Sequence, residues 1–316
     1  MGQLVDGKWQ TGWYAPDANG RFHRPPTQFR SRLSADAQGA FPVEAGRYHL
    51  YASYACPWAH RVLIVRALRA LENVFRVTIV DPKMGDDGWA FASDAPDPNV
   101  GARLLREIYI AARADYTGRV TVPVLWDKQT QNIVSNESRE LMRMLDTELD
   151  AVTSAPSLAP PELRGLIDET LDAIYEPINN GVYRAGFAST QSAYEEACTG
   201  VFAALDHWEQ VLGRQRFLCG GRLTEADVAL FTTLLRFDLV YYAHFKCNVR
   251  RLADYANLSG FVRDVYQTPG VAATCRLDHI KTHYYWSQTT VNPTRIVPLG
   301  PAIDLTAPPD REHLAG

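Results

Sequence analysis

The chain has 316 residues, of which 46% are hydrophobic and 22% are charged, and its formal net charge at pH 7 is −4. This length exceeds the usual size of one hydrophobic core, so two domains are expected. The composition argues against a membrane protein, because no apolar run approaches the ~18 residues of a membrane span, and the scattered basic residues offer no stripe for nucleic acid.

Residues 1–45 predict an irregular N-terminal arm. The segment contains Pro25 and Pro26, shows little periodicity and carries several aromatic residues, which argue against pure disorder. It lacks the apolar stretch of a secretory signal, and Asp6 stands where a myristoylation motif requires Ser or Thr. We therefore expect a cytoplasmic protein.

The pattern then changes to alternating strands and helices over residues 46–150. Strands are predicted at 47–53, 75–80, about 121–127 and 132–135, and helices at about 60–71, about 102–115 and from about 137. The order β-α-β-α-β-β-α predicts an α/β thioredoxin-like domain.

A linker rich in Pro, Ala and Ser at 151–161 separates this domain from residues 162–316. There, apolar residues recur at spacings of three and four, which predicts an all-helical domain with a C-terminal tail. Within it, Thr224 and Asp227 predict a capping box, which would serve folding rather than chemistry.

Cys56 is the candidate nucleophile. Pro57 suits the first position of a helix, which would place Cys56 at the N-cap, where backbone N–H groups and the helix dipole favour a thiolate over the thiol of ordinary pKa about 8.5. His60 and Arg61 follow one turn later, with directions that the sequence does not give. The alternative is a small buried hydrophobe.

No resolving thiol follows Cys56, because Ala59 stands where a CxxC enzyme has its second cysteine. We therefore expect monothiol exchange with a soluble thiol such as glutathione. The other cysteines (Cys198, Cys219, Cys247 and Cys275) lie far apart and form no metal-ligand spacing, so no metal is expected.

Two further segments predict parts of a glutathione pocket. In "TVPVLWD", a cis peptide at Pro123 would present the backbone of Val122 to the cysteine and its ligand. In "SNES", the helix start at Ser138 would bind a carboxylate and Glu137 would accept an ammonium group. The alternatives are a trans proline and simple helix capping by Ser135 or Ser138.

These motifs resemble the glutathionyl-hydroquinone reductases, the Xi class of glutathione transferases. The resemblance extends from about Asp6 to Pro301 and includes "CPWAHR", "DPKMGDDGWAF", "GRVTVPVLWDK", "IVSNESRELMRML" and "HYYWSQTTVNPTRIVPLGP". It implies a homodimer of a form peculiar to the class, with glutathione as co-substrate. The implied reaction reduces S-glutathionyl-hydroquinones to hydroquinones and glutathione disulfide, through a mixed disulfide on Cys56.

The resemblance also implies roles for individual residues. Tyr183 and Tyr284 would act in catalysis, Tyr241 would contact the hydroquinone, and Pro57 and Pro123 would shape the site. The implied glutathione-binding residues are Trp89, Arg119, Val122, Glu137 and Ser138. If the resemblance did not hold, Trp89 would be a surface aromatic and Arg119 a solvated charge.

Alternatives and departures remain. An omega-like glutathione-dependent thioltransferase or dehydroascorbate reductase would share Cys56, and a non-catalytic scaffold is an alternative of another class. Gln288 stands where the family pattern leads us to expect histidine, and Cys247 has no assigned mechanism. The physiological quinone is not encoded in these motifs, and conjugation to electrophiles is expected to be weak.

Overall fold

The computed structural model of the protein describes residues 1–314. The chain divides into two compact units. The first unit comprises Met1–Trp13 and Pro25–Pro156, and the second comprises Tyr14–Arg24 and the chain from Ser157 onward.

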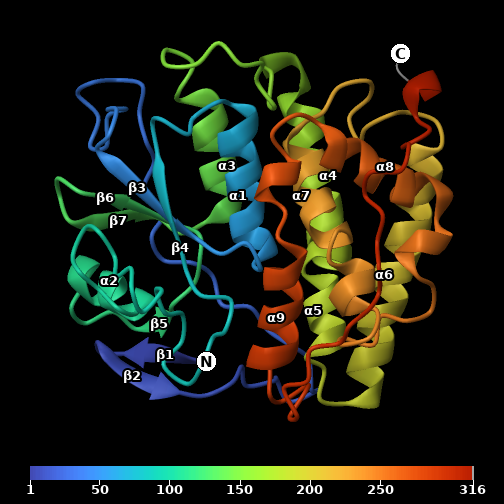
Figure 1. Ribbon diagram of the computed structural model, residues 1–316, viewed down its shortest axis with the longest axis horizontal. Helices are drawn as coiled ribbons and strands as arrows, with labels where there is room; N and C mark the ends of the chain where they lie inside the picture. Colours follow the sequence, from blue (N-terminus) through green and yellow to red (C-terminus); the bar gives the residue numbers. More distant parts are fainter. Residues whose placement is uncertain (315–316) are drawn as a thin grey trace. The chain divides into compact units, whose positions relative to one another are not determined.

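A four-stranded sheet forms the centre of the first unit (Figure 1). Its elements and the helices between them are β3 (Tyr48–Ala52), α1 (Pro57–Leu68), β4 (Arg76–Ile79), α2 (Leu105–Ala112), β6 (Val124–Asp127), β7 (Asn132–Ser135) and α3 (Ser138–Thr147). The strand order is β4-β3-β6-β7; β3 and β4 pair in parallel, and the other pairs are antiparallel. The predicted thioredoxin-like domain is confirmed.

The central strands are covered on both faces. Every residue of β3 and β6 is buried, which is why these strands read as apolar runs without alternation. Helices α1 and α3 lie side by side on one face of the sheet, and α2 lies on the other (Figure 1). At one end of the ladder between β3 and β6, the Arg47 guanidinium donates two bonds to Asp127, from Nε to Oδ1 at 2.9 Å and from Nη2 to Oδ2 at 2.6 Å. This bidentate pair fastens the start of β3 to the end of β6.

Helix α1 begins and ends earlier than the predicted 60–71. It starts at Pro57, whose missing N–H costs nothing at the first position of a helix. It ends at Leu68, because Ala70 adopts a left-handed conformation with φ of 53°. Leu71 lies beyond the helix but is fully buried. Its apolar side chain fits the helical spacing, which is why the predicted helix extended to residue 71.

The prediction of an irregular arm is wrong for its first residues. β1 (Gly2–Val5) and β2 (Lys8–Thr11) form an antiparallel hairpin, which β5 (Gly118–Arg119) extends to three strands. The turn consists of Asp6 and Gly7, both with positive φ (47° and 71°), as a two-residue hairpin turn requires. A Cβ at Gly7 would lie 2.0 Å from the Ala114 carbonyl oxygen.

A second correction concerns Tyr14–Arg24, which belongs to the helical unit. Arg21 pairs with Glu196, and the Phe22 ring packs edge-on against Phe187 at 5.2 Å. The aromatic residues of the arm therefore pack into the two units instead of lying on one surface.

The second unit is helical (Figure 1). Its α-helices are α4 (Arg164–Ile174), α5 (Gly181–Gly186), α6 (Gln191–Leu212), α7 (Glu225–Leu234), α8 (Ala256–Gln267) and α9 (Leu277–Ser287). Two π-helices interrupt them, η2 (Tyr175–Asn179) and η3 (Phe237–Tyr241), and the 3-10 turns are η1 (Pro161–Leu163), η4 (Leu252–Asp254), η5 (Ala272–Thr274) and η6 (Glu312–Leu314). Within residues 1–314, no helix has both the length and the apolar character needed to cross a membrane.

The amino end of α7 is held by the predicted capping box. The buried Asp227 carboxylate accepts from the backbone N–H groups of Thr224 and Leu218, at 2.8 and 2.7 Å, and from the Thr224 hydroxyl at 2.8 Å. Burial raises the pKa of Asp227 to about 6. The residue thus stabilises both the helix start and the preceding loop.

We predict that Asp227→Ala lowers the free energy of unfolding by about 2–4 kcal/mol, because it leaves buried donors without an acceptor. Thermal unfolding followed by circular dichroism measures the loss. Glu107→Ala is the matched control, since Glu107 accepts from the Leu104 N–H at the start of α2 but is exposed; its cost should be about 1 kcal/mol or less. Equal losses in the two variants would contradict the role of burial.

Candidate functional site

Cys56 is the N-cap residue of α1, as predicted. Its backbone is extended (φ −80°, ψ 120°), Pro57 follows at the first helical position, and the Cys56 carbonyl accepts the His60 N–H at 2.9 Å. The half-buried thiol lies 3.7 Å from the Val122 carbonyl oxygen, to which it donates. The sulfur therefore sits between the amino end of a helix and the chain segment just before β6.

The residues one turn beyond Cys56 are buried. His60 is fully buried and Arg61 is 3% exposed, with its guanidinium 4.7 Å from the centre of the Trp58 ring. This cation–π contact places the Arg61 charge against an indole. Cys56 itself lies at the amino end of α1, where backbone N–H groups have no partner within the helix.

The Val122–Pro123 peptide is cis, as predicted. β6 begins at Val124, so Val122 precedes the strand ladder. Tyr109, on α2, holds this segment: its hydroxyl donates to the Thr121 carbonyl at 2.8 Å and accepts from Asn136 Nδ2 at 3.0 Å. Tyr109 thereby connects the "TVP" and "SNES" segments. In the sequence, the helical spacing of Tyr109 indicates only a residue packed in the core, so this positioning role was not predicted.

Helix α3 begins at Ser138, and its N-cap is Glu137 rather than either serine. The Glu137 carboxylate accepts from the Arg139 N–H at 3.2 Å and from the Thr27 hydroxyl at 3.0 Å. Ser135 instead accepts the Glu137 N–H at 3.2 Å, while Ser138 is buried as the first helical residue. A half-buried carboxylate therefore stands at a helix amino end, where it stabilises the helix dipole.

Trp89 and Arg119 are neither a surface aromatic nor a solvated charge. Trp89 is 6% exposed, and its carbonyl accepts the Leu105 N–H at the start of α2. Arg119 lies in β5, and its guanidinium donates to three backbone carbonyls of the N-terminal segment: Gly2 and Gly12 from Nη1, at 3.1 and 3.3 Å, and Trp13 from Nη2, at 2.9 Å. Arg119 thus fastens the hairpin in addition to any role toward a ligand.

In the helical unit, the three tyrosines singled out by the sequence come together. Tyr183 (α5) and Tyr284 (α9) share a hydrogen bond of 2.5 Å between their hydroxyls, and the hydroxyls of Tyr241 (η3) and Tyr284 are 3.1 Å apart. We call Tyr183, Tyr241 and Tyr284 the tyrosine cluster. Burial raises the pKa of Tyr284 well above its usual value, and the neighbouring tyrosines add to the shift. Tyr284 is therefore a protonated phenol at neutral pH.

Aromatic and cationic neighbours surround this cluster. Phe245 stacks on Tyr241 with ring centres 5.4 Å apart and contacts Tyr183 and Tyr284 edge-on. The Arg24 guanidinium lies 5.0 Å from the centre of the Tyr183 ring. These neighbours were not predicted, because Arg24 lies far from the helices in the chain and the family motif "HFKCN", which contains Phe245, suggested no role for that residue.

Gln288 is the departure from the family pattern, and its Oε1 accepts a hydrogen bond of 2.9 Å from His244 Nε2. His244 is buried against Tyr285, with ring centres 4.7 Å apart. Burial lowers the pKa of His244 to about 4, against a smaller opposing effect from Gln288. A neutral imidazole therefore occupies this position at neutral pH.

The remaining cysteines form no disulfide and do not gather into a metal site. All five cysteines are thiols, and residues 1–314 contain no group of three or more His, Cys, Asp or Glu side chains placed to hold a metal ion. Burial raises the thiol pKa of Cys219, Cys247 and Cys275, the last to about 11. Of the five, Cys56 alone stands at the amino end of a helix opposite a segment predicted to bind a ligand.

The chain is similar to glutathione transferases in both units. Residues 55–148 match the N-terminal and residues 191–264 the C-terminal domain family of glutathione S-transferases. It is 49% identical over 99% of both chains to the glutathionyl-hydroquinone reductase YqjG of Escherichia coli (strain K12). This chain belongs to the glutathionyl-hydroquinone reductases, the Xi class of glutathione transferases.

Solved structures of Xi-class and related proteins have the same fold. A Xi class GST from Natrialba magadii superposes with a TM-score of 0.94 at 50% identity, covering 100% of this chain and 98% of that one. The glutathione bound structure of YqjG, a glutathione transferase homolog from Escherichia coli K-12, gives 0.88 at 47% identity, covering 98% of this chain and 99% of that one. The predicted Xi-class membership is confirmed.

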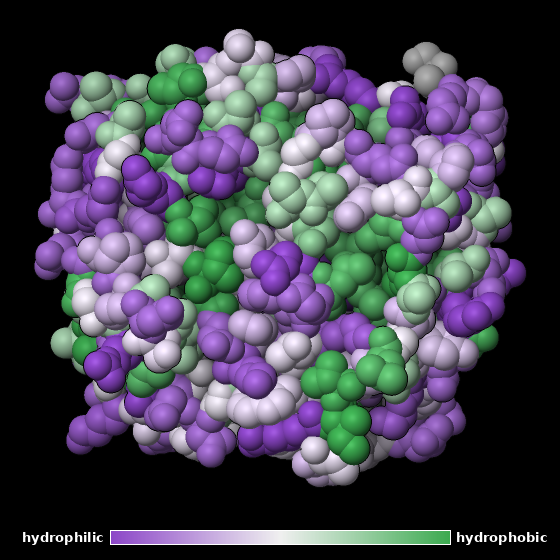
Figure 2. Space-filling view, viewed as in Figure 1, coloured by the Kyte–Doolittle hydropathy of each residue, from purple (hydrophilic) through white to green (hydrophobic). Residues whose placement is uncertain are grey.

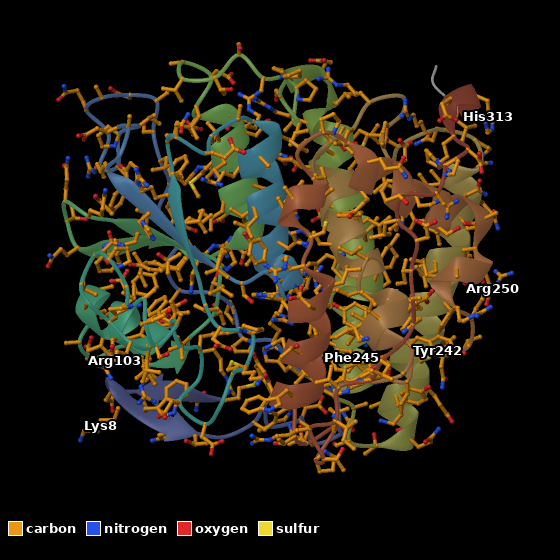
Figure 3. All side chains as sticks on the ribbon, viewed as in Figure 1. Lys8, Arg103, Tyr242, Phe245, Arg250 and His313 are labelled. Carbon is orange, nitrogen blue, oxygen red and sulfur yellow. The ribbon has the colours of Figure 1, made fainter. Side chains whose placement is uncertain are left out.

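We predict that Arg119→Met loosens the N-terminal hairpin, because three backbone carbonyls lose their donor. Trypsin should then cleave after the exposed Lys8 (Figure 3) severalfold faster, as mass spectrometry of the early fragments would show. Arg113→Met, which removes a guanidinium stacked on Phe29 but no bond to the hairpin, is the control. Unchanged cleavage at Lys8 would contradict the fastening role of Arg119.

We also predict a pH dependence of stability from His244. The folded-state pKa of about 4 lies below the ordinary 6.5, so the unfolded state binds more protons between these values. Stability therefore falls as the pH drops from about 6.5 to about 4, by up to about 1.4 kcal/mol per pH unit for this residue. His244→Asn should flatten the slope of unfolding free energy against pH, whereas the same change at exposed His23 should not. Parallel slopes for wild type and His244→Asn would contradict the assignment.

Proposed function

We propose that the protein reduces S-glutathionyl-hydroquinones at Cys56, with glutathione as the reductant. Family membership at about half identity over the full chain supports the activity. The single structural observation that carries the assignment is a lone thiol at a helix amino end, facing the carbonyl before a cis-proline strand, with no cysteine at position 59.

In the proposed reaction, the Cys56 thiolate attacks the glutathionyl sulfur of the substrate. The new sulfur–sulfur bond forms as the bond between that sulfur and the ring carbon breaks, and the ring carbon takes a proton, so that free hydroquinone leaves. Glutathione then attacks the mixed disulfide as a thiolate, releasing glutathione disulfide and the Cys56 thiolate. The two electrons that reduce the ring thus come from the substrate's thioether sulfur and from the sulfur of one glutathione, which end together as glutathione disulfide, while Cys56 is regenerated.

We propose that the backbone of Val122 and the start of α3 hold glutathione beside Cys56. Val122 would pair with the peptide part of glutathione as an added strand. Ser138 and the amides of α3 would bind a carboxylate, and Glu137, which stands half-buried at that helix end, would accept the γ-glutamyl ammonium. Trp89 and Arg119 would complete the pocket, with the bonds that Arg119 makes to the N-terminal segment fixing where its charge lies.

For the hydroquinone, we propose binding at the tyrosine cluster. A protonated Tyr284 can donate a hydrogen bond to a phenolic oxygen of the ring, and the hydroxyls of Tyr183 and Tyr241 hold its orientation. The aromatic faces of the cluster and Phe245 suit a planar ring. We further propose that the protein works as a homodimer in the cytoplasm, as the family resemblance implies.

Replacing the nucleophile tests the proposal directly. With excess glutathione, release of hydroquinone from a synthetic S-glutathionyl-hydroquinone should fall at least a thousandfold in Cys56→Ser, because a serine hydroxyl cannot form the mixed disulfide. Cys198→Ser changes a buried thiol of the helical unit and should keep near-wild-type turnover. Liquid chromatography of the free hydroquinone measures both.

The outcomes of this experiment separate the alternatives. No release by the wild type, together with brisk reduction of a small glutathione mixed disulfide, would favour the omega-like thioltransferase. No turnover of either substrate would favour the non-catalytic scaffold. Equal release by wild type and Cys56→Ser would remove Cys56 from the mechanism.

The tyrosines should affect the hydroquinone half of the reaction alone. We predict that Tyr284→Phe lowers kcat/KM for the glutathionyl-hydroquinone about 10- to 100-fold, since one hydrogen bond to the developing charge is lost. The rate at which glutathione resolves the mixed disulfide should stay within twofold of wild type. Tyr285→Phe, one residue along α9, is the matched control. A fall in both half-reactions would point to a general structural defect.

A further inference from the structure

The helical unit contains a cavity that the proposed reaction does not use. Its volume is about 520 Å³, within the range of small-molecule pockets. The end of α7, the segments around η3 and η4, helix α8, helix α9 and the C-terminal tail at residues 298–305 form its walls. In Figure 2, apolar side chains gather beside this tail.

The C-terminal tail is fastened across the cavity by specific bonds. Gln267 Nε2 donates to the carbonyls of Leu305 and Ala307, both at 2.8 Å, and Lys281 Nζ donates to the Leu299 carbonyl at 2.6 Å. Farther along the tail, the buried Arg311 donates to the carbonyls of Leu212, Gln215 and Arg216. The C-terminal tail is therefore held to the helices by hydrogen bonds within and after the stretch that lines the cavity.

Most of the cavity lining is apolar. Its few polar side chains differ in how many hydrogen bonds they make. Both carboxylate oxygens of Asp238 accept backbone N–H groups of η4. Asp304 accepts the backbone N–H groups of Thr306 and Ala307 at Oδ1, and its pKa is lowered mainly by the Thr306 hydroxyl, with a smaller contribution from the Arg263 charge. By contrast, within residues 1–314 the hydroxyl of Tyr242 has no hydrogen-bond partner, and the Arg263 guanidinium has none besides the Pro308 carbonyl, 3.0 Å from its Nε. A cation and a phenol thus have hydrogen-bonding capacity to spare in a mostly apolar cavity, whose lining also includes Arg251 and Ser259.

The elements that line this cavity also carry the tyrosine cluster. The π-helix η3 supplies Asp238 to the cavity and Tyr241 to the cluster, and the next residue, Tyr242, returns to the cavity. On α9, Tyr284 belongs to the cluster, while Tyr285 lines the cavity and donates to the Leu239 carbonyl of η3 at 3.3 Å. Figure 3 labels Tyr242, which lines the cavity, and Phe245, which packs against the tyrosine cluster. A shift of η3 or α9 would therefore move residues of both.

We propose that this cavity is a second ligand site, which binds a small apolar organic acid. The ring or chain of the acid would fill the space between Val262, Ile303 and Tyr285, and its anionic group would bind Arg263 with the Tyr242 hydroxyl as donor. Through η3 and α9, its occupancy changes the affinity of the tyrosine cluster for the hydroquinone. This second clause rests on the proposed function, whereas the binding site does not.

Binding is tested on the full-length protein with 1-anilinonaphthalene-8-sulfonate, an apolar aromatic anion whose fluorescence rises in apolar sites. We expect one saturable site per chain, weakened at least tenfold by Arg263→Met and by Ala302→Trp, which places a large ring at the mouth from an exposed position on the tail. Arg250→Met, at an exposed arginine of the same unit outside the cavity, should leave the affinity within twofold (Figure 3). Absence of binding, as when a second copy covers the opening, or equal binding by all variants would overturn the proposal.

Coupling is tested by repeating the hydroquinone-release assay with the dye near saturation. The KM for the glutathionyl-hydroquinone should change severalfold in the wild type and stay constant in Ala302→Trp. A constant KM in the wild type, with dye binding intact, would overturn the coupling. If no variant releases hydroquinone, the proposed function fails, while the dye titration still decides whether the site exists.

Discussion

The register of β3 against β6 is the constraint on which the candidate site depends. Tyr51 pairs with Val124 in an antiparallel ladder, so Cys56, which follows β3, and Val122, which precedes β6, emerge at the same edge of the sheet. A slip by one residue would turn every side chain of β6 to the opposite face. The buried pair between Arg47 and Asp127 fastens the far end of the same ladder. The distance of 3.7 Å between the Cys56 sulfur and the Val122 carbonyl oxygen follows from this pairing.

The surroundings of the thiol are held by contacts that are distant in the chain. Tyr109 connects the segment before β6 to the segment before α3, and Arg119 connects β5 to the N-terminal hairpin. In this way the irregular segments before β6 and before α3 acquire fixed positions, the first beside Cys56 at the amino end of α1 and the second at the amino end of α3. The hairpin is therefore part of the unit that carries Cys56.

The features that could be predicted from sequence are those with local physical causes. Pro57 sets the start of α1, and the pair Thr224 and Asp227 caps α7 through bonds that span three residues. The hairpin has a local turn signal at Asp6 and Gly7, but the strand that completes its sheet is a two-residue segment more than a hundred residues away, which no local pattern indicates. The tyrosine cluster could be approached only through the family resemblance. No periodicity indicates that side chains from α5, η3 and α9 share hydrogen bonds.

The central claim is that Cys56 carries the glutathionyl group between two half-reactions, and a single turnover without added glutathione tests it most directly. The protein is mixed with an excess of S-glutathionyl-hydroquinone, the released hydroquinone is counted, and peptide mass spectrometry locates the added group. The account predicts one hydroquinone per chain and glutathione on Cys56 alone. Glutathione on another cysteine, or no hydroquinone until free glutathione is supplied, would contradict it.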